Sequence, residues 1–262
     1  MSWTNSRALA VIALAALATL SSCGGGGSSG LSGPVPSSSG EPGSSPTAAV
    51  TPTPSPPPVS SQTIETNAGT VAGTTGMFSP TEGDTPSGGS GAPVDGIDCE
   101  PTMSNNYHIH IFLGVFYNGA QMALPIGVGM ENPGTPVSGF LNTATCFYFL
   151  HTHDSSGIVH VEDPNPTNAP ITASLFTLQN VLDVWGITAD ANHFGPFNGP
   201  VEVFTSGQVY RGDQNNGTVP ASTLTYWGSN PNTIPLYSHE LIYVFVGTPP
   251  ASVPSVNFYT EY

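Results

Sequence analysis

The sequence predicts a small α+β domain that is rich in β-structure, with three hairpins and one short helix. Within residues 107–117, aliphatic side chains at every second position alternate with histidine and phenylalanine, which is the two-residue period of a strand. Asn118-Gly119, a strong hairpin signal, follows that run. A single segment, residues 177–186, has the pattern and the end signals of a helix. A β-sandwich is the alternative architecture.

The first predicted hairpin begins with the strand at 107–117 and returns over residues 121–128, where Pro125 marks an edge or a bulge. Successive side chains of a strand point to opposite faces. One face of the first strand therefore carries Ile109, Ile111, Leu113 and Val115, and the other carries His108, His110, Phe112 and Phe116.

The remaining elements follow in order along the chain. Residues 146–153 and 158–162 are expected to form a second hairpin around the turn at 154–157. Thr177 then serves as the N-cap of the helix, and Gly186 ends it. A third hairpin is predicted between residues 201–205 and 208–211, and residues 240–246 form a last apolar strand.

Residues 1–22 are expected to be a secretory signal. Arg7 precedes an apolar run, residues 8–20, which is shorter than the ~20 residues that cross a bilayer. Leu20-Ser21-Ser22-Cys23 then resembles the lipobox of bacterial lipoproteins, whose cysteine is lipidated. We therefore expect an exported protein, anchored to the membrane of the cell envelope by a lipid on Cys23, with its domain outside the cytoplasm. An ordinary secretory signal with an unrelated cysteine is the alternative.

Residues 23–94 are predicted to be a disordered tether because Gly, Ser, Pro and Thr dominate them and leave little apolar surface to bury. Residues 95–262 contain all seven histidines and form the predicted globular domain. Cys99 and Cys146 remain there once Cys23 is lipidated, and an oxidising compartment favours a disulfide between them. Two thiolate metal ligands are the alternative.

Charge excludes one class of partner. The chain carries 17 acidic residues against two basic ones and no lysine, for a net charge of −15. Such a surface repels the phosphate backbone, so nucleic-acid binding is not expected. The same surface tolerates or attracts cations.

The histidines predict a metal site. In the second hairpin, a turn that pairs His153 with Ile158 also pairs His151 with His160 and sets Glu162 opposite Phe149. His151, His153, His160 and Glu162 then share one face, with opposed Cβ atoms about 5 Å apart. That spacing suits two imidazoles on one ion, whereas a three- or five-residue loop would break the arrangement.

The predicted ligands are His108, His110, His151, His153, His160 and Glu162. His108 and His110 share a face of the first strand, and they either complete the site or form a second one. Asp154, His239 and Glu240 are candidates to lie behind the ligands and orient them. A buried network of hydrogen-bonded His, Asp and Glu without a metal is the alternative.

The strings Tyr107-His-Ile-His110, Leu150-His-Thr-His-Asp154 and His160-Val-Glu162, with the helix from Phe176 to Gly186, resemble a family of secreted bacterial and archaeal proteins of unknown function. The resemblance covers most of residues 99–247. It implies an independent exported domain and brings no activity or substrate. Cupins and copper/zinc superoxide dismutases also contain His-x-His strands, but their spacings differ from those here.

Three functions follow as hypotheses. The first is a lipid-anchored envelope protein that binds a transition metal, with copper or zinc favoured. The second is a metal-dependent surface enzyme, an oxidoreductase or hydrolase, with Glu162 or Asp154 as base. The third is a structural or adhesive surface module without a metal. The sequence leaves the protein partner and any small-molecule substrate open.

Overall fold

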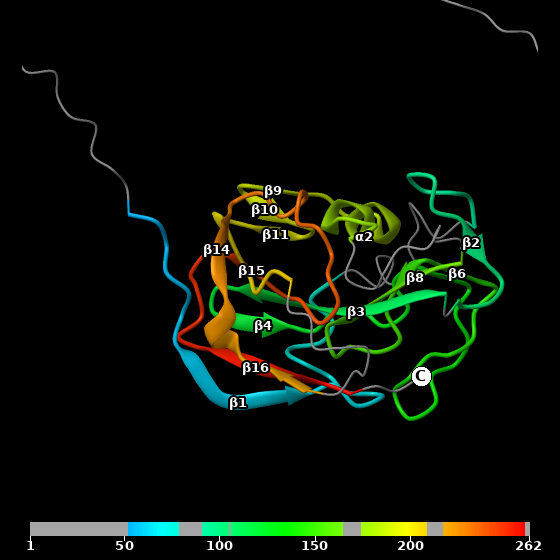
Figure 1. Ribbon diagram of the computed structural model, residues 1–262, viewed down its shortest axis with the longest axis horizontal. Helices are drawn as coiled ribbons and strands as arrows, with labels where there is room; N and C mark the ends of the chain where they lie inside the picture. Colours follow the sequence, from blue (N-terminus) through cyan, green and yellow to red (C-terminus); the bar gives the residue numbers. More distant parts are fainter. Residues whose placement is uncertain (1–51, 79–90, 105, 165–173, 209–216, 260–262) are drawn as a thin grey trace, which may run out of the picture. The chain divides into compact units, whose positions relative to one another are not determined.

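A long strand, β3 (Tyr107–Tyr117), is the centre of the fold (Figure 1). The computed structural model describes residues 52–78, 91–104, 106–164, 174–208 and 217–259. Along one edge, β3 pairs in parallel with β15 (Leu241–Val246). Along the other edge it pairs antiparallel with β8 (Ile158–Asp163) and β4 (Ala120–Met122). β12 (Val201–Thr205) and β14 (Thr225–Gly228) extend the sheet beyond β15, and β7 (Leu150–His151) extends it beyond β8.

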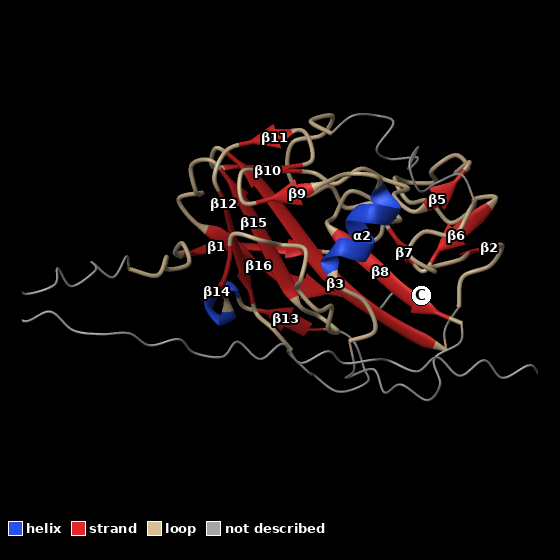
Figure 2. Cartoon of the chain, turned by 90° about the horizontal axis from the view of Figure 1, so that it is seen from above, coloured by secondary structure: helices blue, strands red, loops and turns tan. Residues whose placement is uncertain are grey.

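Two apolar layers cover the faces of this central sheet. The predicted alternation of β3 is confirmed, because Ile109, Ile111, Leu113 and Val115 pack in one cluster with helix α2 (Leu178–Trp185). Phe112 and Phe116 lie in the second cluster, with the side chains of β16 (Val253–Phe258). Figure 1 shows α2 on one side of the sheet and β16 on the other, and Figure 2 shows α2 from above. The predicted β-rich α+β class is confirmed.

The predicted helix boundaries are also confirmed. Thr177 is the N-cap, and its backbone amide donates to the Asn180 side-chain oxygen at 2.9 Å. Gly186 ends the helix with a φ of 82°, and its amide donates to the Leu182 carbonyl at 2.8 Å. A left-handed conformation of this kind favours glycine.

Three further sheets are small. β1 (Val59–Glu65) and β13 (Gly217–Val219) flank β16, and β2 (Cys99–Glu100) and β5 (Met130–Glu131) flank β6 (Cys146–Tyr148). The last contains β9 (Ala189–Asp190), β10 (His193–Phe194) and β11 (Phe197–Asn198). A 3-10 turn, η1 (Ala221–Thr223), precedes β14.

The predicted tether is wrong over part of its length. Residues 59–65 form β1, which pairs in parallel with β16. Phe78 is buried, with its ring 4.8 Å from that of Trp185. β1 is mostly exposed and needs only the edge of β16 for its hydrogen bonds, so its polar composition resembles that of a linker. Residues 1–51 and 79–90 lie outside the described residues.

Two predicted strand pairings differ from those observed. β12 pairs with β14 on one edge and β15 on the other, whereas the sequence predicted pairing with the segment 208–211. Of that segment, residues 209–211 lie outside the described residues. The return strand of the first hairpin is limited to Ala120–Met122 rather than residues 121–128. The Asn118-Gly119 turn itself is as predicted, with Tyr117 paired to Ala120.

Candidate metal centre

Strand register brings the predicted ligands together at one end of the central sheet. His151 of β7 pairs with His160 of β8, as predicted, and His160 pairs on its other side with His110 of β3. One row further along, Glu162 pairs with His108. Because side chains two residues apart share a face, four histidines and the glutamate project from three adjacent strands toward the same space.

His153 reaches the cluster from the loop after β7. Its ring centroid lies 4.8 Å from that of His151 and 4.4 Å from that of His160. Phe140 stacks on the His153 ring at 4.7 Å. The four residues His151, His153, His160 and Glu162 each expose no more than 4% of their surface. A group of polar side chains at that depth needs partners, because burying unpaired polar groups is costly.

Two glycines allow the loops at this end of the sheet to pack closely against the strands. Gly157, with a φ of 95°, lies where a Cβ would come within 2.8 Å of the Phe112 ring. Gly129, with a φ of 71°, leaves no room for a Cβ beside the Leu150 carbonyl of β7. These two glycines let the turns pack directly on β3 and β7.

The ligand atoms fall into two overlapping groups. His151, His153, His160 and Glu162 form one, and His108, His110 and His160 form the other; within each group the atoms lie within 4.8 Å of one another. In the first group, the Nε2 atoms of His151 and His153 are 3.1 Å apart. In the second, His160 Nδ1 lies 3.3 Å from His108 Nε2 and 3.2 Å from His110 Nε2.

Two backbone carbonyls orient the rings of the first group. His151 Nδ1 donates to the Tyr148 carbonyl at 2.7 Å, and His153 Nδ1 donates to the Leu141 carbonyl. A carbonyl only accepts, so each Nδ1 carries the proton and each Nε2 presents its lone pair. The two lone pairs face each other across 3.1 Å. A cation between them removes this repulsion, and two nitrogens on a tetrahedral zinc are about 3.3 Å apart.

The histidines are neutral, as ligands must be. Burial lowers the pKa of His151 and of His153 to about 4. Burial, reinforced by the neighbouring histidines, holds the pKa of His110 and His160 well below the usual range. At pH 7 these four rings therefore offer lone pairs without first losing a proton, which favours metal binding.

Glu162 supplies the negative charge of the cluster. Its Oε1 lies 3.4 Å from His108 Nε2, 3.7 Å from His160 Nδ1 and 3.8 Å from His151 Nε2. Its Oε2 accepts a hydrogen bond from the Ser104 amide at 3.0 Å. Burial raises the pKa of Glu162, whereas His151 and the Ser104 amide favour the charged form. A bound cation would offset the cost of burying this carboxylate.

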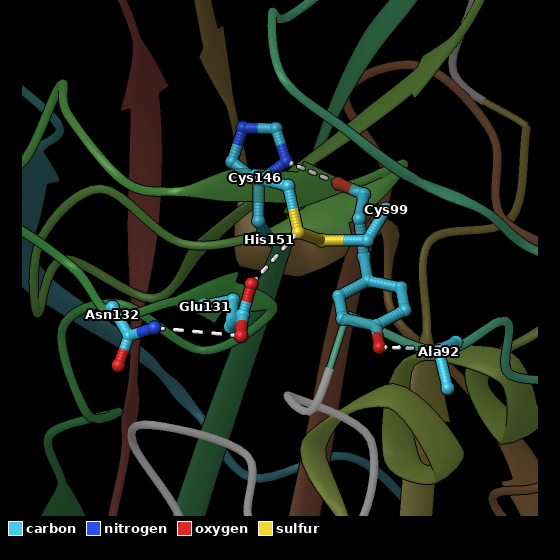
Figure 3. The surroundings of a disulfide bond; sticks show 7 residues. Ala92, Cys99, Glu131, Asn132, Cys146 and His151 are labelled. Atoms are coloured by element: carbon cyan, nitrogen blue, oxygen red, sulfur yellow. Dashed lines mark hydrogen bonds between the residues drawn. A yellow bond between two sulfur atoms is a disulfide. The ribbon is translucent and has the colours of Figure 1, made fainter.

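The predicted disulfide is present beside the cluster. Cys99 of β2 and Cys146 of β6 are bonded across 47 residues. Figure 3 shows His151 next to this bond, with its ring hydrogen-bonded to the backbone of β6. The disulfide thus ties the segment that leads to Ser104 to the strand whose Tyr148 carbonyl orients His151. Both cysteines are therefore excluded as thiolate ligands.

The three residues predicted to orient the ligands make the following contacts. Asp154 accepts hydrogen bonds from the Gly69 and Ser156 amides, so its carboxylate holds the turn that follows His153. Glu240 accepts from the Thr205 hydroxyl and the Tyr237 amide. The backbone amide of His239 donates to the His110 carbonyl at 2.7 Å, and its ring packs on Phe258.

A large and a small cavity in the described part of the chain lie against histidines of the cluster. The larger, about 530 Å³, is bounded by His108, His153, His160 and Glu162 on one side and by apolar residues that include Phe140 and Phe147. The smaller, about 20 Å³, is bounded by His110, His153, Asp154 and His160 among others. A volume of that size holds about one water molecule or ion. The larger cavity has the size of a small-molecule site.

Sequence reasoning missed the groups that orient the rings. The Leu141 and Tyr148 carbonyls and the Ser104 amide belong to the backbone, so no residue type signals their role. Phe140 was likewise missed, because its contact with His153 joins two separate loops.

This buried cluster of histidine and glutamate has the donor set of a metal site. Among the residues that the structure describes, no helix is both long and apolar enough to cross a membrane. No family model, curated protein or solved structure matches the chain.

Proposed function

We propose that this protein binds a transition-metal ion through His151, His153, His160 and Glu162. The observation that carries the proposal is the pair of Nε2 atoms of His151 and His153, which face each other at 3.1 Å while both Nδ1 atoms are engaged by carbonyls. A cation bound by both Nε2 atoms would satisfy two lone pairs held in this way.

Copper or zinc is the favoured ion. Three imidazole nitrogens and one carboxylate oxygen suit Zn and Cu, whereas Ca and Mg prefer sites made of oxygen atoms. The cysteines take no part because they form the disulfide. The proposed location is the cell envelope, with a lipid on Cys23. That location rests on the apolar run 8–20 and the Leu20–Cys23 motif.

The test begins with the untagged full-length chain, stripped with a chelator and dialysed against Zn²⁺ or Cu²⁺. We expect at least one ion per chain by elemental analysis. At 100 times Kd, the ion should stabilise the fold by about 2.7 kcal/mol, which raises Tm by roughly 5–10 °C. His151→Ala and His153→Ala should lose both effects. His193→Ala, a histidine of β10 that pairs with Asp190 outside the cluster, should retain them. A chain that binds no ion and keeps its Tm would instead be the structural or adhesive module.

A second candidate function, metal-dependent catalysis, is favoured by the cavity of about 530 Å³ beside the cluster. A bound ion would supply a Lewis acid there. Glu162 faces this cavity and is placed to accept a proton, whereas Asp154 is engaged by two amides. The test is a screen of ester hydrolysis with the zinc form and phenol oxidation with the copper form. Activity that Glu162→Gln abolishes at a metal concentration that keeps the weakened site fully occupied would support the enzyme.

A further inference from the structure

The cluster contains more ligands than one ion of the favoured kind uses. Five histidines and Glu162 converge in the space between β3, β7 and β8. Zinc in proteins takes four ligands in structural sites and three in catalytic ones. Once His151, His153, His160 and Glu162 hold an ion, His108 and His110 remain beside it with their Nε2 atoms aimed at the cluster.

His160 stands between the two groups. It lies on β8, paired with His151 of β7 on one side and with His110 of β3 on the other. Its ring is nearly parallel to that of His151 and lies edge-on to that of His110, at 75°. Its Nδ1 is directed to His108 and His110 at 3.3 and 3.2 Å. An imidazole has two nitrogens, so one ring can ligate two ions.

Glu162 is also within reach of both groups. Its Oε1 lies 3.4 Å from His108 Nε2 in one group and 3.8 Å from His151 Nε2 in the other. A carboxylate between two cations lowers their mutual repulsion. The cavity of about 20 Å³ beside His110 provides further space, and Asp154 lines it as a second carboxylate.

We infer that the cluster holds two metal ions, the second bound by His108, His110 and the shared His160. This inference rests on the proposed function, because the first ion must bind at His151 and His153. The second ion uses Nδ1 of His160, which faces His108 and His110. The first ion uses Nε2 of the same ring. Binding of the second ion therefore displaces the remaining N–H proton of His160 to solvent, and Glu162 is the anionic ligand common to both.

The test is stoichiometry. The chelator-treated full-length chain is titrated with Zn²⁺ and, separately, with Cu²⁺, and the ions retained are counted by elemental analysis. We expect two ions per chain. His110→Ala should retain one ion, and the matched control His193→Ala should retain two. Copper adds a second readout, because two Cu²⁺ ions that share an imidazole couple magnetically. The wild-type EPR signal should therefore account for far less than two spins, and His110→Ala should show one full spin.

Two results would contradict the inference, and they differ in what they imply for the proposed function. One ion per wild-type chain, with a full-intensity copper signal, would overturn the second site and leave the proposed metal binding intact. No ion at all would overturn both. Because the wild-type count decides the matter, a His110→Ala variant that fails to fold would leave the conclusion unaffected.

Discussion

His151 and His160 stand directly opposite each other on β7 and β8, and their rings stack with centroids 5.5 Å apart and planes 14° apart. Val159 and Val161, the neighbours of His160, point into the main apolar core on the other face. A register slip by one residue would turn the imidazole into that core and place both valines in the ligand cluster. Burial of Val159 and Val161 in the core therefore fixes the register that places His160 in the cluster.

Gly157→Ala tests how strongly the turn after β7 depends on close packing. Its φ of 95° strains any other residue, and the added Cβ would meet the Phe112 ring at 2.8 Å and the Leu113 carbonyl at 3.0 Å. We expect the free energy of unfolding to fall by about 2–3 kcal/mol, as measured by urea denaturation. Gly96→Ala is the control, because Gly96 has a φ of 79° with nothing within 4 Å of the added Cβ. A loss of equal size in both variants would contradict the packing argument.

Glu162→Gln separates metal binding from stability. The amide keeps the shape of the side chain and an acceptor for the Ser104 amide, but it removes the charge near His108, His151 and His160. Metal affinity should fall at least about tenfold, as measured by competition with a chelator. The Tm of the metal-free variant should be unchanged or higher, because a buried carboxylate no longer needs compensation. Glu202→Gln on β12 should leave both quantities unchanged.

The disulfide should support both the fold and the site. Replacing Cys99 and Cys146 together by serine removes a cross-link over 47 residues. Such a loop stabilises the folded state by about 4 kcal/mol on the chain-entropy account. Metal affinity should also fall, because β6 carries the Tyr148 carbonyl that orients His151. Denaturation curves and chelator competition measure the two effects. An unchanged affinity would show that the carbonyl keeps its place without the bond.

Glu240 predicts a pH dependence of stability. Burial raises its pKa to about 7, against hydrogen bonds from Thr205 and Tyr237 that favour the charged form. The folded state therefore binds the proton more tightly than the unfolded state, whose pKa is near 4.5. Tighter proton binding by Glu240 therefore adds to the free energy of unfolding. This contribution is fully present below about pH 4.5 and is lost as pH rises through 7.

The comparison of the wild type with Glu240→Gln isolates this carboxyl from the other titrating groups. The difference in free energy of unfolding between the two metal-free chains should change by about 3 kcal/mol between pH 4.5 and 8. The wild type should become less stable relative to the variant as pH rises. Urea denaturation at several pH values measures it. A difference that stays constant with pH would contradict the raised pKa.

Local sequence patterns were enough to predict the part of the site that lies in the hairpin of β7 and β8. The alternation along β3, the Asn118-Gly119 turn and the pairing of His151 with His160 all depend on residues close in sequence. The neighbour of β8 was not predictable in this way. That His110 and His108 lie beside His160 and Glu162 follows from the pairing of β3 with β8, some 50 residues apart.

The misassigned segments share a physical cause. β1 is polar and mostly exposed, and its partner β16 lies about 190 residues away, so no local pattern marks it as a strand. The 201–205 strand was recognised, but its partners β14 and β15 are also distant. The carbonyls of Leu141 and Tyr148 act through the backbone, which residue identity does not encode.

The most direct test of the metal centre is anomalous diffraction from crystals of the zinc- or copper-loaded protein, recorded at the absorption edge of the metal. We expect a peak about 2.0–2.2 Å from the Nε2 atoms of His151 and His153, within the group that includes His160 and Glu162. Loaded crystals with no anomalous peak in this cluster, or with the ion bound elsewhere on the acidic surface, would contradict it.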